Sequence, residues 1–495
     1  MRTKNARRVA ILLILVLALA LAVACGGDDN GNGVTPPEGN GGQVTPPADT
    51  PDYGNGVIDQ GPMLGGIHEP VDFGGRVLTT GGWWHGILAG FRPAYDDPDP
   101  ATAGNYHMER LIFENARRVE REFGVVFEEN IMGSDEILEV LTTSIMAGEP
   151  FADLTMANAS MIFASAINNL IVPLESINLP NSDLLNRQFY TRVATQGLGH
   201  WWAYIHAEPE ATGVTLGVNL DLINALGVPN PIDLYNSGQW TWDAFLDIMR
   251  TATRDTTGDG IIDQFGIAGQ PGDFLPFLIA ANDGPLMTDD FQYNMDHPNT
   301  IHALEFANTI FREGLWEYDR TIGADIGDWG VNFWAYQNGN SVFWISMTWN
   351  MNDGDLPFEF GVVPVPLGPA NTSGYTWMSA WRQGYSIPIG NSVWTPAEVL
   401  MIGEELLSWP GYEIELMTDG ALNWSRHVFL TEEDAVRQVG AMFTMRLEDA
   451  LNVPGFGGIW GTFVNYFVTQ ELTVMQAIEA HRGPQQELLD IAFGG

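Results

Sequence analysis

Residues 108–131, "MERLIFENARRVEREFGVVFEENI", combine an amphipathic helix with the strand that directly follows it. Apolar side chains recur at helical spacing through Leu111, Val119 and Phe123, and Gly124 is a typical helix stop. The next residues, "VVFEENI", predict a strand. This short helix and strand form one unit of an α/β fold.

The same alternation continues on both sides of this unit. The segment "RVLTTGGWW" at 76–84 predicts a strand, and 135–149 and 151–158 predict a further helix and strand. Strands that alternate with amphipathic helices indicate a parallel sheet. Ligands of such sheets bind beyond the carboxyl ends of the strands. Four side chains are therefore expected near a common cleft: Trp83, Trp84, His85 and Asn158.

The second half of the chain has a similar texture. Residues 240–255, "WTWDAFLDIMRTATRD", predict a helix capped by Thr241. The remaining elements are strands within 341–350, 358–369 and 382–390, a helix from Pro396 and a C-terminal helix at 473–493. The length predicts two or three domains or lobes.

The loop at 255–266, "DTTGDGIIDQFG", is similar to a calcium-binding loop. An EF-hand closes on a bidentate Glu at position 12, and that position is Gly266 here. The sequence leaves two interpretations open: a tight turn that leads into a short strand at 261–267, or a weak calcium site. The calcium ligands would be Asp255, Thr257, Asp259, the Ile261 carbonyl and Asp263.

The N-terminus, residues 1–25, predicts a secretory signal peptide with a basic start and an apolar run of 16 residues from Val9 to Ala24. A membrane-spanning helix needs about 20 residues. Cys25, the only cysteine, follows small residues at the expected cleavage point, and this context resembles a bacterial lipobox. We therefore expect a lipid on Cys25, and a single cysteine excludes a disulfide within the chain.

The residues after Cys25 and the overall charge limit the functions of the exported part. Residues 26–74 are rich in Gly, Pro, Asn and Asp and predict a disordered tether. Four of the 21 Lys and Arg leave with the signal peptide, so 17 remain against 62 Asp and Glu, a net charge of −45. Such an acidic surface repels nucleic acid and anionic lipid heads, which argues against binding to either.

Several motifs in order resemble the extracellular solute-binding lipoproteins of bacterial ABC importers, a group that includes many sugar and oligosaccharide receptors. The resemblance runs from about Gly75 to Phe493. It rests on "FENARRVEREFGVVFEE", "EVLTTSIMAGEPFADLTMAN", "LIVPLESI", "TLGVNLDLINALGV", "WTWDAFLDIMRTATRDTTGDGIIDQFGI", "NGNSVFWISMTWN", "FGVVPVPLGP" and "YSIPIGN". In that family the aspartate loop is a surface element for which calcium is an optional stabiliser. No other cofactor is implied.

The resemblance implies a two-lobed, type II periplasmic-binding-protein-like α/β fold whose lobes close over a ligand about a hinge. The expected segments are lobe 1 at 75–205, lobe 2 at 206–378, a return to lobe 1 at 379–412 and C-terminal helices, mainly of lobe 2, at 413–495. It also implies a monomer, anchored by lipid outside the cell membrane, that delivers its solute to an ABC permease. The chain departs from the family in "VNLDL", where the usual aromatic and lysine are missing, and at Asn158, where relatives often have Asp.

Sugar recognition needs aromatic platforms together with carboxylate, amide and guanidinium partners. The chain has 17 Trp. Beside the four residues of the first lobe, the expected ligand contacts are Glu208, Trp349, Trp377, Trp381 and Arg382. Each has an alternative structural role, in the core for the tryptophans and on a solvated hinge surface for Glu208.

Two other classes of protein remain as alternatives. A carbohydrate-active hydrolase would use a pair of carboxylates, but no G-x-S-x-G, H-E-x-x-H or Walker motif occurs, and the nine His lack metal-ligand spacing. A structural or adhesive surface lipoprotein would have an apolar or filled cleft instead of a wet, aromatic-lined one. The sequence favours the receptor and leaves the identity of its solute open.

Overall fold

The computed structural model describes residues 67–83, 107–133, 136–180, 182, 200–204, 214–269, 271–317, 336, 338–347, 356–375, 377–378, 383–390, 393–407, 431–442, 445–446 and 449–494. All of these belong to one unit, Pro62–Gly495, and the preceding unit, Met1–Gly61, lies outside the described residues. The predicted signal peptide, with Cys25, and most of the predicted tether therefore lie outside them too.

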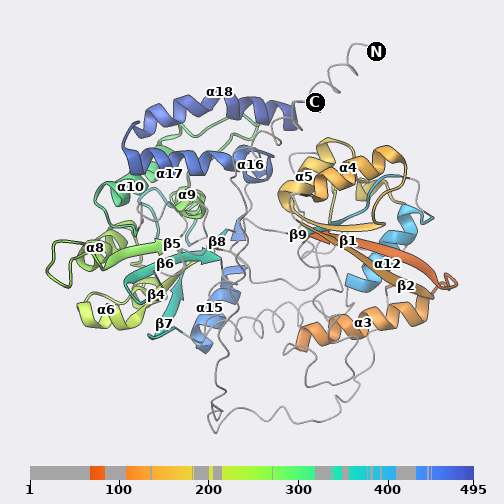
Figure 1. Ribbon diagram of the computed structural model, residues 1–495, viewed down its shortest axis with the longest axis horizontal. Helices are drawn as coiled ribbons and strands as arrows, with labels where there is room; N and C mark the ends of the chain where they lie inside the picture. The colour runs from red at the N-terminus through yellow and green to blue at the C-terminus, as the bar shows by residue number, and fades with distance from the viewer. Residues whose placement is uncertain are drawn as a thin grey trace, which may run out of the picture. The chain divides into compact units, whose positions relative to one another are not determined.

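Lobe 1 is built on a four-stranded sheet with the strand order β2-β1-β3-β9 (Figure 1). Its elements are β1 (Arg76–Trp83), α3 (His107–Phe123), β2 (Val125–Met132), α4 (Ile137–Ala147), β3 (Leu154–Asn158), α5 (Ala159–Ile167), η1 (Leu174–Ser176), β9 (Gln383–Ser386) and α12 (Pro396–Leu407). β1 is parallel to β2 and β3, and β9 pairs antiparallel with β3. The alternation of helix and strand predicted for this half is confirmed.

The local sequence explains where these elements begin and end. Val119 and Phe123 bury the inner face of α3, as their helical spacing predicts. Gly124 ends the helix with a φ of +58°, and a Cβ there would lie 2.1 Å from the Asp72 carboxylate. Glycine is required at this position both for the left-handed backbone and for the close approach.

Lobe 2 contains a second four-stranded sheet, with the order β5-β6-β4-β7. Its elements are β4 (Val214–Asn219), α6 (Leu220–Leu226), α7 (Pro231–Asn236), α8 (Trp242–Ala252), β5 (Phe265–Gly269), α9 (Pro271–Ala280), α10 (Pro298–Arg312), β6 (Ser341–Met347), β7 (Phe360–Val363) and α15 (Glu432–Met442). In this sheet β5 and β6 are parallel to each other, whereas β4 runs antiparallel to both β6 and β7. The sheet is therefore mixed.

One predicted strand begins later than its apolar residues indicate. The sequence predicts a strand at 261–267, but β5 starts at Phe265. Ile261 is 68% exposed and lies in the aspartate turn, where its backbone N–H donates to Asp259. The turn hydrogen bonds therefore override the β propensity of the two isoleucines.

Aromatic side chains fill the core of lobe 2. Trp240 is fully buried, and its ring lies 5.6 Å from that of Phe245 and 5.7 Å from that of Phe343. Its Nε1 donates to the Pro364 carbonyl at 2.8 Å. Thr241 caps α8 by accepting from the Ala244 N–H, as predicted.

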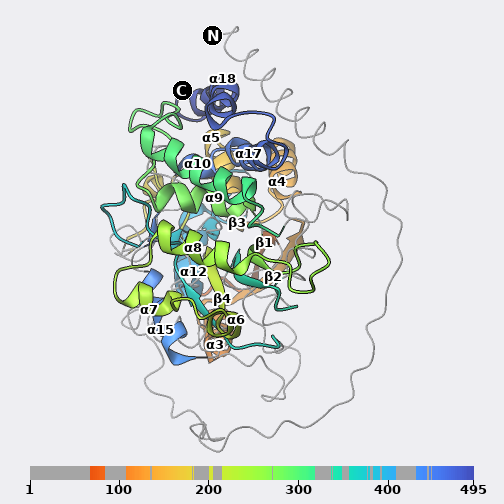
Figure 2. The ribbon, with the colours of Figure 1, turned by 90° about the vertical axis from the view of Figure 1, so that its left-hand side faces the viewer.

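The C-terminal region consists of β10 (Met445–Arg446), α16 (Asp449–Asn452), η5 (Phe456–Gly458), α17 (Ile459–Thr469) and α18 (Val474–Phe493). β10 pairs in parallel with β8 (Trp377–Met378). α17 packs against α9 and α10 of lobe 2 and against α18, and Figure 2 shows α18, α17 and α10 near one another. α16 instead packs against α5 of lobe 1. The C-terminal region therefore contacts elements of both lobes.

A half-buried histidine of α18, whose ring packs against Phe463 and Tyr466 of α17, predicts pH-dependent stability. Burial lowers the pKa of His481 from its ordinary value of 6.5, and its buried Nε2 has no hydrogen-bond partner among the described residues. The unfolded chain therefore binds this proton at a higher pH than the folded chain does. The contribution to stability is present above about pH 6.5 and is lost as the pH falls through the folded-state pKa.

We expect the wild type to lose urea resistance between neutral pH and pH 5 more steeply than His481→Gln, because the amide does not titrate there. Urea unfolding midpoints measured at several pH values would test this difference. Equal slopes for the two proteins would contradict it.

Candidate functional site

The carboxyl ends of the lobe 1 strands bring predicted site residues to one edge of the sheet. Trp83 ends β1 opposite Met132 of β2, and Gly82 lies opposite Met156 of β3. Asn158 ends β3, and the antiparallel register places Gln383 directly opposite it. The structure thus brings Trp83, Asn158 and Gln383 together on this edge.

Gln383 was missed by the sequence reasoning. The available signal was its position directly after Trp381 and Arg382, both of which were predicted as ligand contacts. Only the strand pairing with Asn158 places Gln383 at the edge of the lobe 1 sheet.

Asn158 has a local structural role that its position in the sequence did not reveal. It is the N-cap of α5, and its Oδ1 accepts from the Met161 N–H at 2.9 Å and from the Ser160 hydroxyl at 2.8 Å. The side chain is 7% exposed. These capping bonds engage the carbonyl oxygen of the amide. A ligand contact by Asn158 stays a prediction.

The other predicted ligand residues are described incompletely or not at all. Trp83 and Trp377 are described in their backbone only, in β1 and β8. The residues outside the described ranges are Trp84, His85, Glu208, Trp349, Trp381 and Arg382. Their roles stay predictions.

The described residues just before the predicted boundary between lobe 1 and lobe 2, at 205/206, lie next to β9. Tyr204 and Tyr385 exchange backbone hydrogen bonds of 3.0 and 2.6 Å, and both side chains are buried. A Cβ at Gly403 of α12 would lie 2.0 Å from the Tyr204 hydroxyl, so only glycine lets the helix approach this tyrosine. The segments at 204 and 385 are therefore held side by side in lobe 1.

The carboxylates of the aspartate loop are engaged by the loop itself. Asp255 accepts from the N–H groups of Thr257, Gly258 and Gly260 at 2.6–3.0 Å. These backbone bonds, chiefly those from Gly260 and Gly258, lower the pKa of Asp255. Asp263 accepts from the backbone and the hydroxyl of Thr256. The loop therefore has the hydrogen bonds of a tight turn.

Within the described ranges, no three His, Cys, Asp or Glu side chains are grouped so that they could hold a metal ion. A calcium ion at this loop would need the carboxylates to exchange backbone donors for the metal. Calcium binding there stays a prediction.

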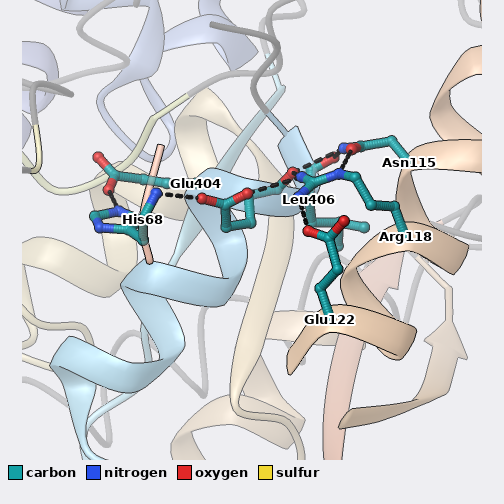
Figure 3. A network of polar contacts seen from close by, with 7 residues as sticks. His68, Asn115, Arg118, Glu122, Glu404 and Leu406 are labelled. Carbon is teal, nitrogen blue, oxygen red and sulfur yellow. Dashed lines mark hydrogen bonds and ion pairs between the residues drawn. The ribbon is translucent and has the colours of Figure 1, made fainter. Parts of the chain in front are cut away.

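The most buried ionic cluster of the described chain lies elsewhere, between α3, α12 and the residues before β1 (Figure 3). Glu404 and Glu405, adjacent in α12, are 1% and 0% exposed. Glu405 accepts from Arg118 Nη2 at 2.7 Å and from the His68 backbone N–H at 2.6 Å. Glu404 lies 2.5 Å from His68 Nε2 and accepts from the Ser182 hydroxyl. Both buried carboxylates are therefore paired and hydrogen-bonded.

The Arg118 guanidinium joins this cluster to α3. Its Nε donates to the Asn115 Oδ1 and its Nη1 to Glu122, while Asn115 donates to the carbonyls of Glu405 and Leu406 at the end of α12. The cluster connects His68, near the start of the described chain, to Arg118 of α3 and to Glu405 of α12. Glu405 follows His68 by 337 positions in the sequence. Sequence reasoning did not single out any of these residues, and their arrangement is suited to holding the lobe together.

The family of the chain follows from comparison with known proteins. Residues 124–392 match the model of the bacterial extracellular solute-binding protein family. The match covers more than half of the chain, so this protein belongs to that family. A comparison with curated protein sequences finds no match for this chain.

Solved structures with the same fold are solute-binding proteins of low sequence identity. A maltose/maltodextrin-binding domain from Bdellovibrio bacteriovorus, bound to maltotriose, has a TM-score of 0.54 and 14% identity, over 83% of this chain and 99% of that one. A cyclic α-maltosyl-1,6-maltose binding protein from Arthrobacter globiformis has a TM-score of 0.57 and 15% identity, over 85% and 100%. A solute-binding protein from Agrobacterium radiobacter K84 with ribitol has a TM-score of 0.56 and 15% identity, over 85% and 100%.

These neighbours confirm the predicted two-lobed, type II periplasmic-binding-protein-like fold. The family consists of exported substrate-binding proteins, which agrees with the predicted class of protein. Among the described helices, none has the length and apolar character needed to cross a membrane.

Proposed function

We propose that this protein is a lipid-anchored receptor that captures an extracellular oligosaccharide by hinge closure and delivers it to an ABC permease. The observation that carries the proposal is the family match over residues 124–392. The anchor rests on Cys25 at the end of the signal sequence, followed by a tether rich in Gly and Pro.

An oligosaccharide is favoured over other solutes by two observations. Five of the predicted ligand contacts, at 83, 84, 349, 377 and 381, are Trp, and aromatic faces are the usual platforms for sugar rings. Neighbours of the same fold were solved with maltotriose, mannotriose or cycloalternan, and others with ribitol or α-D-tagatose. An aromatic-rich binding protein of this fold is therefore best matched to a sugar ligand.

The proposed ligand contacts lie at and beyond the strand ends. Trp349 follows "FWISM" and is proposed to stack on a sugar ring. On the lobe 1 side, Trp83, Asn158 and Gln383 share one edge of the sheet. The further proposed contacts are Trp84, His85, Glu208, Trp377, Trp381 and Arg382.

A thermal-shift screen of the chain from Gly26 onward, without the signal peptide and Cys25, would test the function. Maltotriose, mannotriose, ribitol, a mixed tripeptide and calcium would serve as probes. A ligand at 100 times its dissociation constant adds about 2.7 kcal/mol of stability. We expect an oligosaccharide to raise the melting temperature of the wild type.

Two variants connect that stabilisation to the proposed site. Trp349→Ala should abolish the stabilisation by sugar, whereas Trp349→Phe, which keeps a flat apolar face, should retain part of it. Stabilisation by calcium alone, or by none of the probes, would contradict the receptor proposal. It would favour a structural surface lipoprotein instead.

A further inference from the structure

The last residue of α18 places one aromatic ring between the two lobes. The Phe493 ring stacks on that of Phe291, which belongs to the segment between α9 and α10, with centroids 4.1 Å apart and an interplanar angle of 12°. Its other contact is edge-to-face with Phe163 of α5, at 5.4 Å and 78°. Phe493 therefore joins lobe 2 to a helix of lobe 1.

The lobe 2 half of this contact is firmly built. Tyr293, two residues after Phe291, donates its backbone N–H to Gln486 Oε1 at 2.7 Å and its hydroxyl to the Ile478 carbonyl at 3.1 Å. Arg482 of α18 also pairs with Asp296 at 2.7 Å. Because these bonds tie the segment to α18, Phe291 and Phe493 belong to one rigid group.

The lobe 1 half of the contact depends on apolar packing, in a core cluster that Phe163 shares with Ala450 and Val453 of the C-terminal region. Phe163 is fully buried in α5, a helix that packs on β3 and β9 of the lobe 1 sheet. The other element of the C-terminal region that packs on α5 is α16, which follows β10. β10 in turn pairs with β8, at Trp377 and Met378. The helix α16, which packs on α5, is therefore linked through β10 and β8 to the segment from 379 onward, in which the chain is predicted to return to lobe 1.

We propose that Phe493 is a latch that sets the balance between two arrangements of the lobes. The inference rests on the hinge closure of the proposed function. A rotation between the lobes leaves the Phe291–Phe493 stack intact, because both rings belong to lobe 2, and changes the Phe163–Phe493 contact. A contact made in one arrangement only shifts the equilibrium by its own free energy. Phe493 therefore tunes ligand affinity without contacting the ligand.

The latch can be tested without any ligand, by measuring distances between the lobes. The chain from Gly26 onward, without the signal peptide and Cys25, has no cysteine. Glu139→Cys on α4 and Glu305→Cys on α10, both exposed positions, would therefore carry the only two spin labels. Double electron-electron resonance then gives the distribution of distances between the lobes in the unliganded protein.

Phe493→Ala is expected to change the ratio of the two populations by between about twofold and tenfold, the effect of losing one aromatic pair. Phe493→Leu, which keeps apolar bulk and a folded C-terminus, should change it in the same direction by less. Phe306→Ala is the matched control, since its ring stacks on Trp242 at 4.5 Å within lobe 2. It should leave the distribution unchanged.

Distance distributions that are the same in wild type, Phe493→Ala and Phe493→Leu would overturn the latch. So would a Phe306→Ala effect as large as that of Phe493→Ala. Because the measurement uses no sugar, a failure of every glycan to stabilise the protein would reject the proposed function only. A shifted distribution would still support the latch in that case.

Discussion

Arg118→Met is expected to lower the free energy of unfolding by about 3–5 kcal/mol, because it leaves Glu405 as a buried charge without its cation. Glu405 is 0% exposed, so water cannot replace the guanidinium. The remaining donor to this carboxylate among the described contacts is the His68 backbone N–H. The substitution also removes the bonds from Arg118 to Asn115 and Glu122 within α3, whereas the bonds from Asn115 to the α12 carbonyls remain.

Urea unfolding followed by tryptophan fluorescence would measure the effect. The exposed Arg250 provides the control, since its bidentate pair with Glu313 is solvated and Arg250→Met should cost no more than about 1 kcal/mol. The double variant Arg118→Met, Glu405→Leu should recover much of the loss, because it removes the unpaired charge. Equal costs for Arg118→Met and Arg250→Met would show that the buried cluster does not stabilise lobe 1.

Trp240→Ala is expected to destabilise the protein by about 3–5 kcal/mol through the cavity that it leaves in lobe 2. The side chain is fully buried between Phe245 and Phe343. It also provides the Nε1 hydrogen bond to the buried Pro364 carbonyl, at the end of β7. Its loss therefore combines lost packing with an unsatisfied acceptor.

Trp240→Phe separates these two contributions. It keeps an aromatic ring, loses the Nε1–H donor and leaves a smaller cavity than Trp240→Ala does; the unsatisfied carbonyl by itself should cost about 1–3 kcal/mol. Met475→Ala on the exposed side of α18 should change stability by less than about 0.5 kcal/mol. Guanidinium unfolding curves of the three variants would give these values. A Trp240→Ala cost near that of Met475→Ala would contradict the packing argument.

The tryptophans show which features of the binding site could be predicted from the sequence and which could not. Their abundance predicted aromatic platforms for a ligand, yet Trp240, Trp242, Trp316 and Trp344 are buried in lobe 2. A tryptophan in a strand or helix has the same local pattern whether it faces a core or a binding site. Position relative to strand ends was the better guide, and it placed Trp83 and Asn158 on the observed sheet edge.

The aspartate loop and the buried glutamates illustrate the opposite case. Alternating aspartates predicted either a turn or a calcium site, and only the observed N–H donors show that the turn bonds form. From the sequence alone, Glu404 and Glu405 would be interpreted as charged residues on a solvated helix face, although both are buried. Their partners His68 and Arg118 lie 336 and 287 positions away, so no local pattern could pair them.

The sequence by itself determined the order of helices and strands in lobe 1, the caps such as Thr241 and Gly124, and the resemblance to solute-binding proteins. These features depend on periodicity and on hydrogen bonds between near neighbours, which a short window of residues contains. Only the tertiary structure decided the antiparallel pairing of β9 with β3 and of β4 with β6, the burial of Glu404 and Glu405, and the Phe163–Phe493 contact. Strand pairing, buried charge and packing between helices join residues far apart in the chain, and their free energy depends on which surfaces exclude water together.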